Sequence, residues 1–143
     1  MVTGISNNTN IIMPTADRNY CTFDETKVQS YLQKGEGALP LLEDTFNKTN
    51  DEKEICEALY ITNRLLDNGV KGVDKLYLAL SKYNDTKSPN IQTFLAGVYR
   101  KTKVPDGFGP LVKMLIQNSI NPPQNVPFDP NEEIGGAILD YLA

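Results

Sequence analysis

The sequence predicts an all-α fold, a short right-handed α-α superhelix (solenoid) of about three helix pairs behind an N-terminal capping helix. The main observation is a phrase that begins at Gly37, Gly72 and Gly107, at a constant spacing of 35 residues. Each glycine is followed by an apolar residue at the next position, by leucine four positions on and by another apolar residue five positions on. This spacing places the three side chains on one helix face. Because so short a unit cannot bury its own apolar stripe, such units stack around a continuous core.

Length and composition indicate one folded domain. The chain has 143 residues, of which 40% are apolar and 22% charged, as in ordinary globular proteins. No apolar run approaches the roughly 18 residues that a membrane span needs, and the first residues lack the order of a secretory signal, so we expect no membrane partner and a cytoplasmic location. The net charge of −4 disfavours nucleic acid as a partner.

The residue types disfavour catalysis. The chain has no histidine, the usual proton shuttle near neutral pH and the commonest metal ligand. It also lacks a glycine-rich phosphate loop, so we expect no enzyme activity, no cofactor and no metal. Cys21 and Cys56 are too few for a metal quartet or a disulfide framework, and we expect two thiols, with a single disulfide as the alternative. Acidic residues at 51–57 and 132–133 stand where helices are expected to begin, and negative charge stabilises that end of a helix.

The first half of the chain contains clear helix boundaries. Residues 1–22 are rich in asparagine and threonine without a helical period, so we expect an irregular tail there and one repeat domain over residues 23–143. A helix is expected from the N-cap Asp24 to Gly35, and a second over residues 36–47. Asp51, followed three residues later by Glu54, predicts a reciprocal capping box and a third helix that ends near residue 68.

The second half repeats this plan. A helix is expected over residues 70–83, and Ser88-Pro89 predicts the start of its partner, which runs to about residue 103. The third pair begins at 105–106. Its connecting loop, residues 121–128, is rich in proline and about eight residues longer than its counterparts, and long loops in repeat proteins often carry binding function. Asp129-Pro130 then predicts the last helix.

The last helix lacks the polar outer side that normally closes a solenoid. Its final residues, 137–143, include two leucines, an isoleucine and a tyrosine. We therefore expect that the chain is part of a longer array, that it forms a homodimer through this helix, or that another protein covers it.

The repeated unit resembles the HEAT repeat. The best-matching segments are residues 39–42 leading to 51–66, and residues 76–80 leading to 88–98, and the resemblance covers about residues 24–143. The match is to HEAT-like repeats in a broad, divergent sense. Tetratricopeptide repeats have nearly the same period, but their first-helix pattern is absent and they rank second. The resemblance implies that the second helix of each pair lines a concave surface on which a partner protein binds.

Arg64 and Arg100 occupy equivalent places in successive second helices, with Asn63 and Tyr99 beside them. On the implied concave surface the two arginines would lie about 10 Å apart, the distance between packed helices, and would form a ladder for acidic side chains. The alternative is that each arginine only stabilises the C-terminal end of its own helix. Further candidate contacts are Lys101, Lys103, Tyr60, Tyr83 and Phe128, of which the tyrosines can equally be core residues.

The predicted function is therefore a protein-interaction module, or scaffold, with an unidentified protein partner on its concave face. A first alternative is a structural element that self-associates through the C-terminal helix. A second is a nucleic-acid-binding repeat protein that uses Arg64, Arg100, Lys101 and Lys103.

Overall fold

The computed structural model describes residues 23–143, and the regular structure in this part of the chain is entirely helical, which confirms the all-α class. The tail expected at residues 1–22 lies outside the described residues. The α-helices are α1 (Glu25–Lys34), α2 (Leu39–Lys48), α3 (Glu52–Asp67), α4 (Tyr77–Leu80), α5 (Pro89–Thr102), α6 (Phe108–Ile120) and α7 (Pro130–Leu142). Short 3-10 helices occupy η1 (Gly35–Ala38), η2 (Val73–Leu76), η3 (Ser81–Tyr83) and η4 (Pro105–Gly107).

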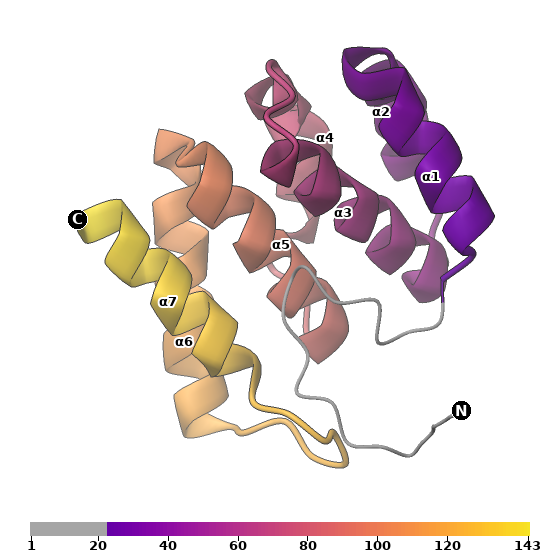
Figure 1. Ribbon diagram of the computed structural model, residues 1–143. Coiled ribbons are helices and arrows are strands. Elements are labelled where there is room, and N and C mark those ends of the chain that lie inside the picture. The colour runs from indigo at the N-terminus through magenta and orange to yellow at the C-terminus, as the bar shows by residue number, and fades with distance from the viewer. Residues whose placement is uncertain (1–22) are drawn as a thin grey trace.

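The odd-numbered helices lie side by side in one layer, with α2, α4 and α6 behind them (Figure 1). In the front layer α1 packs against α3, α3 against α5 and α5 against α7. Behind it α2 contacts α4, and α6 packs on α7 and more lightly on α5. The α6–α7 pair therefore stands at the opposite end of the molecule from α1 and α2 (Figure 1).

Local capping explains where the front-layer helices begin. The Asp24 carboxylate accepts hydrogen bonds from two amides of the first turn of α1, and Ser88 and Asp129 cap α5 and α7 in the same way. At α3, Asp51 accepts from the Glu54 amide at 3.0 Å. The Asp51 amide donates to the Thr49 hydroxyl at 3.1 Å, and that hydroxyl donates to the Glu54 carboxylate. The predicted capping box is thus closed through Thr49.

The sequence predicted a single helix over residues 70–83. This prediction is wrong both in the extent of the helix and in its regularity. Gly69 and Gly72 have φ angles of 80° and 86°, a left-handed conformation that ends α3 and keeps residues 70–72 out of any helix. The segment that follows is divided into η2, α4 and η3. In its last part the Ser81 hydroxyl donates to the Leu78 carbonyl at 2.7 Å, a local bond that competes with regular helix hydrogen bonding.

The core lies between the two layers. Leu59 and Leu95, at equivalent positions of α3 and α5, are both fully buried, and residues 91–99 of α5 are buried without exception. Leu41, expected inside, is 42% exposed, whereas its counterparts Leu76 and Leu111 are buried. Within the described residues α2 packs against α4 on one side only, because it is the first helix of its layer.

Across residues 23–143 none of the helices combines the length and the apolar character that crossing a bilayer requires.

Candidate interaction surface

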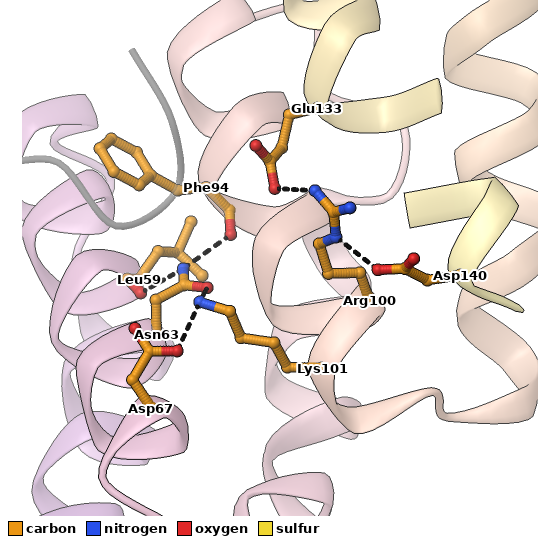
Figure 2. Close-up of polar contacts among 8 residues, drawn as sticks. All are labelled: Leu59, Asn63, Asp67, Phe94, Arg100, Lys101, Glu133 and Asp140. Atoms are coloured by element: carbon orange, nitrogen blue, oxygen red, sulfur yellow. Dashed lines mark hydrogen bonds and ion pairs between the residues drawn. The ribbon is translucent and has the colours of Figure 1, made fainter. Parts of the chain in front are cut away.

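The amide side chain of Asn63 ties α3 to α5 and is completely buried. Its nitrogen donates to the carbonyl oxygens of Leu59 and Phe94, each at 3.0 Å (Figure 2). Its oxygen accepts a hydrogen bond from Lys101 Nζ at 3.0 Å, and the same ammonium group pairs with Asp67 at 3.1 Å. Two residues that the sequence placed on a partner-binding surface are therefore bonded to each other between two helices.

Arg64 and Tyr60 also contact each other. Arg64 Nη1 donates to the Tyr60 hydroxyl at 2.8 Å, and the guanidinium carbon lies 5.7 Å from the centre of the Tyr60 ring. The Tyr60 ring is only 3% exposed and packs against Phe23 and Phe94. Arg64 is half-buried, so part of this side chain remains accessible.

Arg100 joins α5 to α7 through two carboxylates. Its Nη1 donates to Glu133 Oε2 and its Nε to Asp140 Oδ2, both at 2.8 Å (Figure 2). Burial by itself would lower the pKa of Arg100, but the hydrogen bonds that Arg100 donates to Glu133 and Asp140 outweigh it and raise that pKa. The guanidinium also lies against Gly136, where a Cβ atom would come within 2.9 Å of Nη2. A charge on α5 is thus neutralised by α7.

Tyr99 and Tyr83 belong to the core. Tyr99 is 1% exposed, and its hydroxyl donates to Asn84 Oδ1 at 2.6 Å. The Tyr83 hydroxyl donates to the Phe46 carbonyl at 3.2 Å, and burial raises the pKa of Tyr83 to about 12. Lys103 is exposed and ends α5 in a left-handed conformation.

Phe128 is half-buried in the loop between α6 and α7.

The partner-binding role of all the candidate residues described above stays a prediction. The structure brings Asn63 and Lys101 into contact between α3 and α5, whereas Arg64 bonds Tyr60 within α3 and Arg100 bonds carboxylates of α7. Sequence reasoning missed both acidic partners of Arg100: it assigned Glu133 to the stabilisation of its own helix start, and it gave Asp140 no role. Glu133 and Asp140 are seven residues apart and so share one side of a helix, a spacing that could have indicated a common partner.

An apolar surface lies at the far end of the molecule, on α6 and α7. Ile116 on α6 is 53% exposed, and Leu139 and Leu142 on α7 are 68% and 69% exposed. Val112 on α6 and Ile138 on α7 are partly buried beside them. We call these five residues the outer face.

The ion pairs show which way this face points. Glu133 and Asp140 mark the side of α7 that meets α5. At 100° per residue, Leu142 lies nearly opposite them and Leu139 lies next to it. On α6, Lys113 pairs with Asp85, in the turn before α5, at 2.8 Å. Ile116, three residues after Lys113, lies beside it on the helix surface, and Val112 lies about 100° away. On α7 the outer face is therefore turned away from α5.

Charge is sparse on the outer face. Several residues interspersed with its apolar side chains are small or neutral: Gly109, Ser119 and Gly135. Lys113 borders the face beside Ile116, and Glu132 lies at its rim, at the start of α7. Large exposed apolar side chains with a polar rim are typical of a protein-protein contact.

The opposite end of the molecule has a different character. The exposed side chains of α1 are polar, among them Thr26, Gln29 and Gln33, and its one fully buried residue is Val28. The outer side of α1 is therefore polar, whereas the outer side of α7 carries Leu139 and Leu142.

The surface of the described residues also has grooves, and two of them lie near the features above. One, of about 440 Å³, lies among α1, α2 and α3 above Leu42 and Ala58. Its lysines are paired, Lys27 with Glu57 at 2.7 Å and Lys48 with Asp44 at 3.0 Å. The other, of about 390 Å³, lies beside the proline-rich loop and is lined by Lys87, Gln92, Gln117, Asn118, Ile120, Asn121 and Pro123. The described residues hold no group of three or more cysteines and carboxylates that could bind a metal ion.

Known proteins give no guide to the role of this surface. The chain has no significant match among protein-family models, curated proteins or solved structures.

Proposed function

We propose that this chain is a protein-interaction module, a HEAT-like α-solenoid that binds a protein through the outer face of α6 and α7. The observation that carries the proposal is the exposure of the large apolar side chains of Ile116, Leu139 and Leu142 on the neighbouring helices α6 and α7. Large apolar side chains gathered in this way are costly in water unless something covers them.

Two features support the solenoid part of the proposal. The sequence repeats at a constant 35 residues, and the front layer places each odd-numbered helix against the next. A stack of helix pairs is the arrangement in which alternate helices become neighbours. The HEAT-like identity rests on the sequence resemblance.

The version of this function that uses the concave arginine ladder has less support. Arg100 and Lys101 are neutralised within the chain, and Tyr60, Asn63 and Tyr99 would have to leave the core to contact a partner. The same neutralisation weakens the nucleic-acid alternative, because paired cations release fewer counterions. A cytoplasmic location also stays a prediction.

The test is a capture experiment with the immobilised chain. The bait carries Leu139→Lys and Leu142→Lys, and the matched control bait carries Leu41→Lys and Leu78→Lys, which add the same charge at exposed leucines elsewhere. Lysine is chosen because α7 ends there and a helix C-terminus stabilises positive charge. We expect that proteins retained by the natural chain, including free copies of itself, are lost only from the outer-face variant. Equal retention by both variants would refute the proposal.

A further inference from the structure

We infer that the partner of the outer face is a second copy of this chain, arranged with two-fold symmetry so that α6 and α7 of one copy pack on α6 and α7 of the other. This inference rests on the proposed function and names the occupant of the same surface. Two-fold contact is the commonest form of self-association, because a single patch then satisfies both partners.

The contrast between the two ends of the described part of the chain disfavours a head-to-tail arrangement. In that arrangement the outer face would meet α1, whose exposed side chains include Gln29 and Gln33. Leu139 and Leu142 would then be buried against polar groups that lose water without gaining partners. Burial of the outer face against another outer face has no such cost.

The charged residues near the outer face also allow two copies of this face to pair. Two identical faces repel each other when they carry unpaired charges near the symmetry axis. Here Lys113, beside Ile116, is paired with Asp85, and Asp140, on the opposite side of α7 from Leu142, is held by Arg100. Glu132 is exposed at the first turn of α7, ten residues from Leu142 and therefore at the edge of the face. Between the apolar residues the surface has small side chains such as Gly135, which allow two helices to approach closely.

The size of the face predicts a weak and reversible dimer. α6 and α7 have 13 residues each, so each is about 20 Å long. Two such helices about 10 Å apart present a flat area of roughly 400 Å². Stable complexes bury about 800 Å² of each partner, and smaller interfaces belong to transient complexes. We therefore expect a dissociation constant in the micromolar range.

Sedimentation velocity on the full chain tests this inference. From about 5 to 500 μM the natural chain should change from monomer to dimer, across a micromolar dissociation constant. The variant with Leu139→Lys and Leu142→Lys should weaken dimerisation at least tenfold. The control with Leu41→Lys and Leu78→Lys should dimerise like the natural chain. Helical circular dichroism establishes that each variant is folded.

A natural chain that stays monomeric throughout this range overturns the inference, as does a dimer that survives the outer-face substitutions. The proposed function is judged separately by the capture experiment. If the monomeric chain still retains another protein through the outer face, the proposed function stands and only the second copy is wrong.

Discussion

The Arg100 guanidinium lies so close to the backbone of Gly136 that a Cβ atom at position 136 would be 2.9 Å from Nη2 and 3.1 Å from Nη1. The same guanidinium is held by carboxylates three residues before this glycine and four residues after it, Glu133 and Asp140. The absent side chain therefore makes room for the charge, and the two ion pairs determine how α7 lies on α5. This contact orients the outer face away from the stack.

Substitution of the two adjacent glycines of α7 should have opposite effects. In Gly136→Ala the new methyl group displaces the guanidinium from at least one carboxylate, and we expect a loss of about 1 kcal/mol in the free energy of unfolding, even after the gain in helix propensity. Gly135→Ala meets no atom within 4 Å and should gain about 0.5–1 kcal/mol. Urea denaturation under monomeric conditions measures both. Equal stabilisation by the two alanines would show that Arg100 is free to move.

Asn63 should matter more for stability than its neighbour Arg64. Asn63→Ala removes two hydrogen bonds to carbonyl oxygens and leaves a small cavity, so we expect a loss of about 2–3 kcal/mol. Arg64→Ala removes only the partly exposed contact with Tyr60 and should cost less than about 1 kcal/mol. Thermal or urea unfolding separates these values. A larger loss at Arg64 would contradict the structural role of the buried amide.

The Thr49 hydroxyl should stabilise the start of α3. Thr49→Val keeps the shape of the side chain but breaks the relay between the Asp51 amide and Glu54, and we expect a loss of about 1 kcal/mol. Thr45→Val is the matched control, because its hydroxyl only bonds the Leu41 carbonyl within α2. The free energies of unfolding should differ by about 1 kcal/mol between these variants. No difference would mean that Asp51 alone caps the helix.

Buried tyrosines should make the protein sensitive to alkali. Burial raises the pKa of Tyr83 and of Tyr141 to about 12 and also raises that of Tyr99, whereas an unfolded tyrosine titrates near 10. A folded pKa above the unfolded one gives stability that is complete below pH 10 and is lost as pH rises toward 12. The free energy of unfolding should therefore fall above pH 10, less steeply in Tyr83→Phe. A stability that stays constant between pH 9.5 and about 11 would show that these hydroxyls are accessible.

Helix starts were predictable because their signals are local. Asp24, Asp51, Ser88 and Asp129 each bond amides two or three residues away, so the sequence alone identifies them. The late start of the helical segment around α4 was missed because it depends on the left-handed conformation of Gly72.

The contacts of the basic residues were not predictable in this way. The carboxylates that bind Arg100 are 33 and 40 residues further along the chain, and a repeat pattern does not specify which face of a later helix meets them. Nor does it distinguish a surface asparagine from one that bridges two helices, as Asn63 does. The apolar character of the last helix was visible in the sequence, but the direction of each side chain was not. The helical period groups Leu142 with the inward residues Ile134 and Ile138, whereas Leu142 is 69% exposed.

Hydrogen exchange measured by mass spectrometry at low and high protein concentration tests the interaction surface most directly. If the outer face pairs with itself, exchange should slow at about 500 μM relative to 5 μM in peptides from α6 and α7 and stay unchanged in α1 and α2. Slower exchange confined to α1 and α2, or no dependence on concentration in any peptide, would contradict the central claim that the outer face of α6 and α7 is where this chain binds its own second copy.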